Sequence, residues 1–525
     1  MNRYDNIPAE KFQFATRTDL AHDKKFDTKP VSYFQGAFRR FCKNKGAVVG
    51  GIVIAVLVLF AFIAPLFTPF QPAYYDMTYM YVTPKSNLFA NSNIDFWDGC
   101  RVKKTNQIGY LKDVALASET GREIIKNGEY TVSEDGSNYT YRYDTYYGVG
   151  FGKYKIISQE EYNDIQRYQN ETGRQVLYPV VKLADRPTLE KNKYDANIYY
   201  KVENPRASIL RPKLDKDGNI IPNYWKYEAG NESSLMATYN SSRIEGENGV
   251  EQNGKQYFYV YGRKVDGGIE IRAEYYEYYI YKHTQVLKDG IEEPLFLFGT
   301  TQTGKDIFAC LAYGARFSFI FATVVAAVNF IVGVIWGSIS GYFGGKIDLA
   351  MERFAEILGS VPTMIVITLL KYHIGSTSQA LVLFIAFFAT GWIGMAGRTR
   401  MQFYRFKNQE YVLAARTLGA SDSRIMVKHI FPNGLGTIVT SVALVNPSMI
   451  YSETSLSYLG IINLEAGNTT SVGTLIAAGQ QSIMANAAYV ALFPCMFLVL
   501  LMLSFNLFGN GLRDAFNPSL RGSED

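Results

Sequence analysis

A chain of 525 residues is long enough for two to four domains at about 150 residues each. Its formal charge of +5, from 53 basic and 48 acidic residues, does not imply nucleic-acid binding, and four histidines argue against a histidine-rich metal site. The four cysteines are far apart, without a Cys-x-x-Cys pair, which argues against a disulfide framework or a zinc site. Mean hydropathy is close to zero because strongly apolar runs flank one long polar block.

Six apolar runs have the length and composition of membrane-spanning helices, since a hydrocarbon core of about 30 Å needs about 20 helical residues. In chain order they cover residues 47–67, 317–342, 357–370, 380–396, 435–456 and 487–509. The third contains Pro362, and the fifth is weaker in apolar character. The first follows about 46 polar residues and ends without a small-residue cleavage site. It is therefore predicted to be a retained anchor rather than a signal peptide.

Basic residues beside these runs predict their orientation, because short loops rich in Lys and Arg stay in the cytoplasm. They gather before the first run, between the second and third, and between the fourth and fifth: Arg39, Arg40, Lys43, Lys45, Lys346, Arg353, Arg398, Arg400, Arg405, Lys407, Arg416, Arg424 and Lys428. These segments all fall on one side of a six-span chain. Both termini are predicted to be cytoplasmic, and residues 68–314 and 461–486 to lie outside.

The polar block, residues 73–296, carries the turn and alternation signals of β-hairpins. Alternating patterns surround three turn dipeptides: Asp135-Gly136, Asp217-Gly218 and Asp266-Gly267. The last pattern extends through a tyrosine-rich run to Lys282, and residues 158–172 are a helix candidate. The block is predicted to be an α+β domain with its own core. Its clustered tyrosines suit a recognition surface, although strand propensity is the favoured explanation for any single tyrosine.

Residues 298–308 contain part of a phosphate-binding pattern. Gly299, Gly304 and Lys305 fit G-x-x-x-x-G-K, in which backbone amides and the Lys bind phosphates. Asp306 stands where that loop needs a Ser or Thr hydroxyl for Mg²⁺, and a carboxylate there would repel phosphates. The residues that follow are too apolar for the soluble helix of such a fold, and the predicted topology places the stretch outside, where ATP is not normally found. We therefore predict no nucleotide site here.

Residues 409–433 predict two short helices at the inner face of the membrane. The first begins at Glu410 and ends at Gly419, since glycine tolerates the left-handed conformation of a helix C-terminus. Ser421 or Asp422 then caps the second helix. The result is a helix–turn–helix between the fourth and fifth spans.

The same loop contains the small residues Ala414 and Ala415, which permit a partner to come close, and Pro432, which marks the approach to the fifth span. A simple amphipathic connector explains these residues equally well. Their spacing, however, resembles the EAA motif in permease subunits of bacterial ABC importers, where E-A-A is followed by Gly and then by Pro. Ala414, Ala415, Gly419 and Pro432 keep that spacing, whereas Leu413 replaces the Glu.

Other stretches resemble the same family and, within it, the C-type subunit of the oligopeptide, dipeptide and nickel branch. They lie at residues 38–50, 64–72, 298–318, 341–348, 452–460 and 505–521. Departures from the family pattern occur at Gln71, Thr301, Lys305, Cys310, Glu356, Asn510 and Asn517. The resemblance covers residues 33–72 and 297–522, so the polar block replaces a short loop of typical members and its role is not implied.

The resemblance implies an α-helical membrane protein with the six transmembrane helices of a type I ABC importer permease. An extracytoplasmic α+β domain is inserted between helices 1 and 2. The implied parts are a cytoplasmic segment, the first helix, the inserted domain, a five-helix core and a cytoplasmic tail: residues 1–45, 46–72, 73–296, 297–510 and 511–525. The core includes the EAA loop, residues 397–434. Carried over by position, the ATPase-coupling residues are Glu410, Ala414, Ala415, Gly419 and Pro432.

The resemblance also implies what the chain does and with which partners. It is not itself an enzyme, and with a second permease subunit it forms the pathway of an ATP-driven oligopeptide importer in the bacterial plasma membrane. Two cytosolic ATPase subunits bind ATP and Mg²⁺, so this chain is expected to carry no cofactor. An extracytoplasmic substrate-binding protein delivers the peptide. Membrane lipid surrounds the helices, and nucleic acid is not a partner.

Glu453 is the one acid within an apparent span, and intramembrane acids are functional candidates. It either meets the amine of a peptide in the pathway or reaches water near the outer end of the fifth span. Two alternatives to oligopeptide import stay open. The same fold could import dipeptides, nickel chelates or another small solute, or the chain could be a membrane receptor with an extracellular ligand-sensing domain. A receptor needs a cytoplasmic signalling domain, and the predicted cytoplasmic segments have about 45 residues or fewer.

Overall fold

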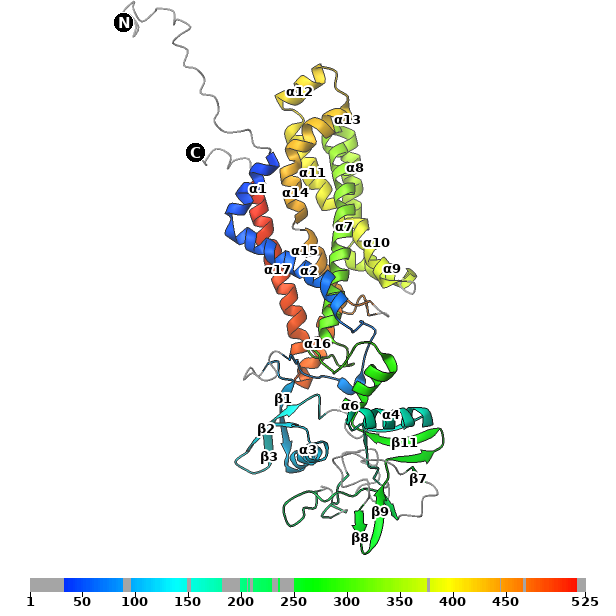
Figure 1. Ribbon diagram of the computed structural model, residues 1–525. Helices are drawn as coiled ribbons and strands as arrows, with labels where there is room; N and C mark the ends of the chain where they lie inside the picture. Colours follow the sequence, from blue (N-terminus) through cyan, green and yellow to red (C-terminus); the bar gives the residue numbers. More distant parts are fainter. Residues whose placement is uncertain are drawn as a thin grey trace, which may run out of the picture.

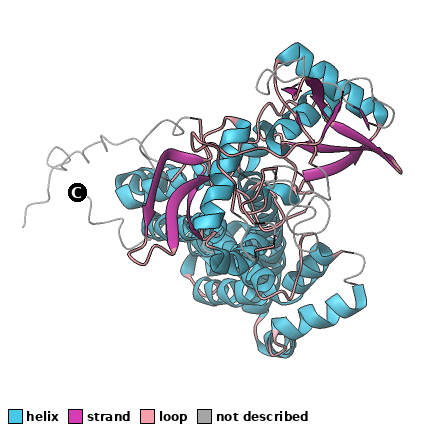
Figure 2. Cartoon of the chain, turned by 90° about the horizontal axis from the view of Figure 1, so that it is seen from below, coloured by secondary structure: helices cyan, strands magenta, loops and turns pink. Residues whose placement is uncertain are grey.

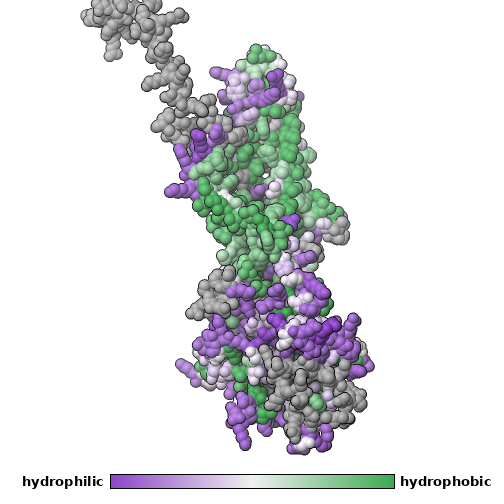
Figure 3. Space-filling model, in the orientation of Figure 1, coloured by the Kyte–Doolittle hydropathy of each residue, from purple (hydrophilic) through white to green (hydrophobic). Residues whose placement is uncertain are grey.

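The computed structural model describes residues 33–87, 96–148, 153–181, 199–204, 206–207, 211–228, 235–236, 250–374, 378–443, 445–465 and 469–516. Figure 1 shows an elongated molecule with a long helical part and, at one end, a mixed α/β part. We call this mixed part, made of the described residues between 73 and 296, the insert. The opposite end carries α12, and we call the two ends the insert side and the loop side. On the face seen in Figure 3, the helical part is largely hydrophobic and the coloured surface of the insert is mostly polar. This division is the one expected of a membrane-embedded bundle that carries a solvated domain.

Five helices of the described chain are long and apolar enough to cross a membrane, and a bent pair makes a possible sixth. Three spans are α2, α7 and α17 (Lys45–Phe67, Ile307–Phe343 and Tyr489–Phe516). The other two combine consecutive helices. One is Gln379–Phe406, made of α10 (Gln379–Gly391) and α11 (Ile393–Phe406), and the other is Asp422–Tyr458, whose main helices are α14 (Phe431–Ala443) and α15 (Val445–Tyr458). Each of these five overlaps a predicted run, although α7 begins at Ile307 rather than at residue 317.

The third predicted span is a bent pair rather than one helix. α8 (Gly345–Gly359) and α9 (Thr363–Ile374) meet at 69°. Pro362 stands between them, and the ring of a proline disfavours the helical conformation in the residue before it. The predicted run 357–370 is therefore divided between two helices of different direction.

Besides the short helices within residues 410–424, α1 and α16 lie outside the predicted spans. α1 (Tyr33–Lys43) packs against the end of α17, where the Arg40 guanidinium donates two hydrogen bonds to the carbonyl oxygen of Ala515, at 2.9 and 3.0 Å. α16 (Val472–Ser482) is held at its start by a capping box of Ser471 and Thr474 and is followed by a single 3₁₀ turn, Ile483–Ala485.

α7 is the central helix of the bundle and packs against α2, α11, α15 and α16. Its contact with α11 depends on three glycines spaced one turn apart: Gly333, Gly337 and Gly341. A Cβ atom on Gly337 would lie 2.2 Å from the carbonyl oxygen of Ala396. The two backbones therefore touch, as is common where membrane helices pack through small residues.

The described part of the insert holds three antiparallel sheets, with strand orders β1-β3-β2, β4-β11-β10-β7 with β5 beside β11, and β6-β9-β8. The strands β1 to β11 are Cys100–Asn106, Ile125–Val132, Asn138–Asp144, Lys153–Ile157, Leu177–Tyr178, Lys226–Glu228, Leu235–Met236, Val250–Gln252, Lys255–Tyr259, Gly262–Val265 and Gly268–Ala273. The helices α3 (Gln107–Thr120), α4 (Gln159–Thr172) and α6 (Tyr275–Tyr281) accompany them. Figure 2, seen from the insert side, shows the strands in two separate groups.

Most turn predictions for the insert are confirmed. The hairpin at Asp135-Gly136 joins β2 to β3, and that at Asp266-Gly267 joins β10 to β11. Near Asp217-Gly218, Leu214 and Ile220 form only an isolated bridge. The helix predicted at residues 158–172 is α4, capped by the Ser158 side chain.

The strand predicted to continue through the tyrosine-rich run is wrong beyond Ala273. There β11 ends, Tyr275–Tyr281 form α6, and a π-helical turn follows at Lys282–Leu287. Every residue of α6 after Tyr275 is buried. Packing on nearly all sides overrides the strand propensity of the tyrosines, a propensity that reflects a half-buried surface rather than a fixed backbone preference.

The buried tyrosines form much of the insert's core. Among the largest fully buried side chains are Tyr79, Tyr146, Tyr162, Tyr178, Tyr200 and Tyr281. Tyr79 alone contacts the rings of Tyr146, Tyr275, Tyr279 and Phe296. These side chains fill space between elements, so they do not belong to an exposed recognition surface.

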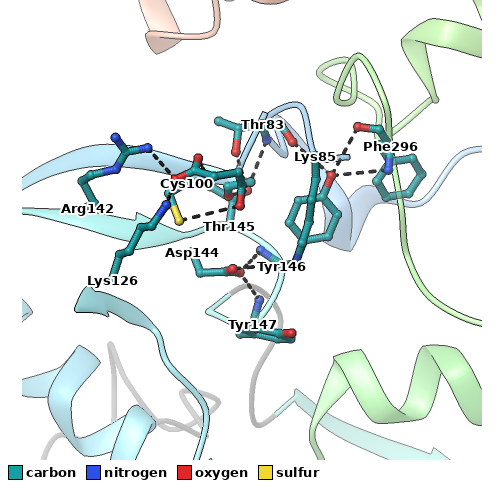
Figure 4. Close-up of polar contacts among 12 residues, drawn as sticks. Thr83, Lys85, Cys100, Lys126, Arg142, Asp144, Thr145, Tyr146, Tyr147 and Phe296 are labelled. Carbon is teal, nitrogen blue, oxygen red and sulfur yellow. Dashed lines mark hydrogen bonds and ion pairs between the residues drawn. The ribbon is translucent and has the colours of Figure 1, made fainter. Parts of the chain in front are cut away.

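The two ends of the insert lie side by side at its junction with the helical part. The amide of Lys85 donates to the carbonyl oxygen of Phe296 at 3.1 Å, and the amide of Thr300 to that of Val82 at 3.0 Å. Figure 4 shows the Tyr146 hydroxyl between them, 3.0 Å from the carbonyl oxygen of Thr83 and 3.4 Å from that of Phe296. This confirms that a large domain can be inserted between α2 and α7 without separating them.

Candidate coupling loop and membrane cavities

α12 (Glu410–Thr417) ends at the glycine turn that the sequence predicts. Gly419 has a φ of +80°, and its amide donates to the carbonyl oxygen of Arg416 at 3.0 Å. The amide of Ala420 donates to the carbonyl oxygen of Ala415 at 3.1 Å. These two bonds are the Schellman motif, which needs a left-handed residue at the glycine position.

The second short helix, α13 (Asp422–Arg424), is tied to α7 rather than capped by a side chain. Ser421 holds the N-cap position but makes no side-chain capping bond. Asp422 instead accepts a hydrogen bond from the Tyr342 hydroxyl at the end of α7, and the Arg416 guanidinium lies 3.5 Å from the same hydroxyl. A π-helical turn, Ile425–Ile430, leads on to α14.

α12 has a buried face and an exposed face. Val412 belongs to a small hydrophobic core with Phe403, Ile425 and Ile430, and Ala415 is also buried. The exposed residues are Glu410, Tyr411, Leu413, Ala414, Arg416, Thr417 and Leu418. Leu418 is 87% exposed, which is unusual for a leucine at the tip of a packed helical loop. Ala414 therefore lies on the exposed face and Ala415 on the buried face. The exposed apolar residues Leu413, Ala414 and Leu418 have the character of a docking surface.

Pro432 is the second residue of α14 and is exposed. The next residue, Asn433, donates from its amide nitrogen to the carbonyl oxygen of His429 at 2.8 Å and to the Tyr411 hydroxyl at 3.2 Å. This contact joins the start of the fifth span to α12. The residues predicted to couple to the ATPase therefore extend from the start of α12 to the start of α14, and the bond between Asn433 and Tyr411 connects these two helices.

A charged cluster fixes the helices beneath the loop. Asp348 of α8 accepts two hydrogen bonds from the Arg400 guanidinium of α11, both 2.6 Å, and further ones from the hydroxyls of Ser340 and Tyr404. Paired Arg–carboxylate bonds hold both partners in a defined geometry. Sequence reasoning includes Asp348 only within a family-like stretch and does not pair it with Arg400, because the two residues are far apart in the chain.

Glu453 is completely buried in α15. Its carboxylate accepts hydrogen bonds from Ser318 of α7 at 2.9 Å and from Ser457 at 3.1 Å, and Ser471 also bonds to it. The alternative in which this side chain reaches water does not match its burial. The carboxylate joins α7, α15 and the start of α16.

Two cavities, each lined in part by α7 and α15, lie on either side of Glu453. The first, on the insert side, has a volume of about 350 Å³ and is lined by Cys310 of α7 and Ser457 of α15 among others. The second, which we call the central cavity, has a volume of about 400 Å³ and is lined by Ala326 of α7 and Met449 of α15 among others. Within α15, Glu453 lies one helical turn from Ser457, which lines the first cavity, and one turn from Met449, which lines the second.

Residues 298–308, which carry the partial phosphate-binding pattern, form a turn that packs against the start of the insert. A Cβ on Gly304 would lie 1.8 Å from the carbonyl oxygen of Asp76, so this glycine permits close backbone contact. The Lys305 ammonium pairs with Glu465 at 2.6 Å. Asp306 caps α7 by accepting from the amides of Phe308 and Ala309, and burial raises the pKa of its carboxyl to about 7. The lysine and the carboxylate therefore have structural partners within the chain.

The bundle of membrane-crossing helices, the cavities within it and the protruding helical loop fit a membrane permease. Residues 333–522 match the family described as "Binding-protein-dependent transport system inner membrane component", and residues 32–84 match the "N-terminal TM domain of oligopeptide transport permease C". The chain belongs to the family of OppC-like permease subunits of binding-protein-dependent transport systems.

Relatives of known name agree with this assignment. The oligopeptide transport system permease protein OppC of Bacillus subtilis is 42% identical over 224 residues, which are 43% of this chain and 72% of the relative. The dipeptide transport system permease protein DppC of the same organism is 38% identical over 224 residues, 43% of this chain and 69% of the relative. One solved structure, of the MetNI methionine ABC transporter in inward-facing conformations, aligns at 19% identity and a TM-score of 0.32. The alignment covers 40% of this chain and 96% of the MetNI chain.

Proposed function

We propose that this chain is a transmembrane subunit of an ATP-driven oligopeptide importer, forming the translocation pathway with a second permease subunit. An extracytoplasmic substrate-binding protein delivers the peptide, and two cytosolic ATPase subunits supply the energy. The observation that carries the proposal is α12: a short helix with an exposed apolar face, held at the tip of the bundle by the Schellman turn at Gly419. The named relatives are permeases for oligopeptides and dipeptides, which supports peptides as the cargo.

In this proposal α12 is the helix to which an ATPase subunit binds. Leu413, Ala414 and Leu418 offer apolar contact, and Glu410 adds a charge at the start of the helix. Gly419 sets the direction of the helix, and Pro432 begins the span that moves with it. Closure of the ATPases would thus be transmitted from α12 through Asp422 and Tyr342 to α7.

The proposed orientation places the loop side in the cytoplasm and the insert side outside. The basic residues near α12 support it, and α1 and the end of α17 lie toward the same side as α12 (Figure 1). Both chain termini are then cytoplasmic. ATP and Mg²⁺ belong to the partner subunits, so Lys305→Ala is expected to leave nucleotide binding by the assembled transporter unchanged. Loss of micromolar ATP binding in that variant would contradict this assignment.

For the insert we propose contact with the substrate-binding protein or with the second permease subunit. Because the backbones of Lys85 and Phe296 are hydrogen-bonded, a hairpin loop of about four Gly and Ser residues can connect them in place of residues 87–294. The replacement also removes the Tyr146 hydroxyl that bridges the two ends, so membrane insertion of the variant is measured first. This variant is expected to insert normally but to show weaker affinity for the binding protein and slower uptake. Wild-type values for both would show that the insert is dispensable for transport.

The test of the function is uptake of labelled peptides of graded length by vesicles that contain the assembled transporter, with and without binding protein and ATP. Uptake that requires both components and is lost when α12 is altered supports the proposal. Uptake of nickel chelates or another small solute in place of peptides would keep the fold but change the cargo. Ligand binding without any uptake would favour the receptor alternative.

A further inference from the structure

The central cavity contains a buried acceptor without a partner. Asn329 of α7 lines the cavity and is only 3% exposed. Its amide nitrogen donates to the carbonyl oxygen of Phe387 at 3.3 Å, but its Oδ1 atom has no hydrogen-bond partner. A Cβ on Gly391 would lie 2.2 Å from that amide nitrogen, so the glycine makes room for this side chain. A buried carbonyl oxygen left unpaired is costly, and an incoming N–H group would relieve that cost.

The same cavity also contains a cation. Arg398 of α11 lines it, is exposed, and among the described residues has no carboxylate within ion-pair distance. The rest of the lining combines Ser441 and Ser448 with apolar side chains and glycines. A mostly apolar wall with a few polar groups and a volume of about 400 Å³ is typical of sites for small organic ligands.

The two polar groups are spaced for a short piece of peptide. Asn329 lies beside Gly391, and Arg398 follows seven residues later on nearly continuous helix, which corresponds to about 10 Å at 1.5 Å per residue. An extended chain covers about 3.3–3.6 Å per residue, so about three residues fit between these positions. One end offers an acceptor for an N–H group, and the other offers a guanidinium for a carboxylate.

We propose that the central cavity is a transient binding station for the backbone of the translocated peptide. Asn329 Oδ1 accepts a hydrogen bond from a peptide amide or amino group, and Arg398 binds the C-terminal carboxylate. The station rests on the proposed function, since it requires that peptides pass through this subunit. Glu453, bonded to Ser318 and Ser457, separates it from the insert-side cavity, so the peptide reaches the station only when α7 and α15 move apart.

A steric test uses two glycines of the same helix. Gly394 and Gly397 are both in α11, and an added Cβ meets no atom within 4 Å at either position, but only Gly394 lines the cavity. In vesicles with the complete transporter and its binding protein, Gly394→Leu is expected to lower uptake of a labelled tripeptide at least about tenfold, the scale of losing one buried interaction. Gly397→Leu is expected to stay within about twofold. Equal uptake by the two variants would overturn the station.

A chemical test compares a tripeptide with its C-terminal amide. Arg398→Gln is expected to reduce the ratio of acid to amide uptake at least about threefold relative to wild type, because a charge-assisted bond to the carboxylate is lost. A merely structural role would lower both rates equally, and an unchanged ratio would overturn the assignment. Asn329→Leu is expected to slow both peptides alike while the ATPase activity stimulated by binding protein is retained. Absence of any peptide uptake by the wild type would refute the proposed function itself, whereas normal wild-type uptake with unaffected variants refutes only the station.

Discussion

Replacement of Gly419 tests the coupling loop directly, because it changes the backbone energy and little else. A Cβ at this position meets no atom within 4 Å, yet the φ angle is +80°. The left-handed conformation costs an L-residue about 1–2 kcal/mol, and a β-branched side chain is among the least tolerant. A cost of about 1.4 kcal/mol lowers the population of the Schellman turn about tenfold relative to competing conformations.

We therefore expect Gly419→Val to insert and assemble normally. Its ATPase stimulation by loaded binding protein should fall by up to about tenfold. Gly419→Asn should retain more of it, since asparagine visits the left-handed region more readily. The assay is ATP hydrolysis by the assembled transporter with and without loaded binding protein.

The matched control is Gly267→Val, in the hairpin turn between β10 and β11. Gly267 also has a positive φ, +93°, and nothing lies within 4 Å of its Cβ position, but it is at the opposite end of the molecule from α12. Full stimulation in Gly419→Val would refute the coupling role. Equal losses in the two variants would show that the effect is general destabilisation rather than a change at the loop.

Three further predictions concern stability and pH. Tyr146→Phe removes the hydroxyl that bridges the two ends of the insert and should destabilise the insert by about 1–3 kcal/mol. The measurement is proteolysis of the insert at increasing temperature, and a cleavage profile identical to that of the wild type would contradict this prediction. Glu274 is the buried residue before α6, and burial raises its pKa to about 7 from its ordinary 4.5, although the Arg122 guanidinium pairs with it at 2.7 Å and opposes the shift. Its stabilising contribution is therefore complete below about 4.5 and is lost as the pH rises through about 7. Glu274→Gln should flatten the pH dependence of the melting temperature of the insert across that range, and an unaltered slope would count against it. Gly337→Leu places side-chain atoms against the Ala396 carbonyl oxygen and should reduce the stability of the helix bundle by about 1–3 kcal/mol. The loss should be detected as a smaller amount of assembled transporter in the membrane. A wild-type amount would show that α7 and α11 can move apart freely.

The sequence by itself determined the features that depend on neighbouring residues. Apolar length located the spans, because a membrane helix must satisfy its own backbone and cover the hydrocarbon core. The Asp-Gly turns located the hairpins β2–β3 and β10–β11, and Gly419 located the end of α12, because a positive φ is a local requirement. Pro362 was visible in the third run, and the bend between α8 and α9 falls there.

Only the tertiary structure decided the features that depend on residues far apart in the chain. The tyrosines of α6 carry strand propensity, and burial on nearly every side made them helical. The Gly-Lys stretch before α7 has the spacing of a phosphate loop, but its role follows from the backbone of Asp76 and the carboxylate of Glu465. Asn329 was detectable as an amide in an apolar run, yet its unpaired oxygen and the nearby Arg398 became a candidate site only when α7 and α11 enclosed a cavity. The physical reason is that local spacing sets backbone conformation, whereas burial and the pairing of polar groups are set by which helices the fold brings together.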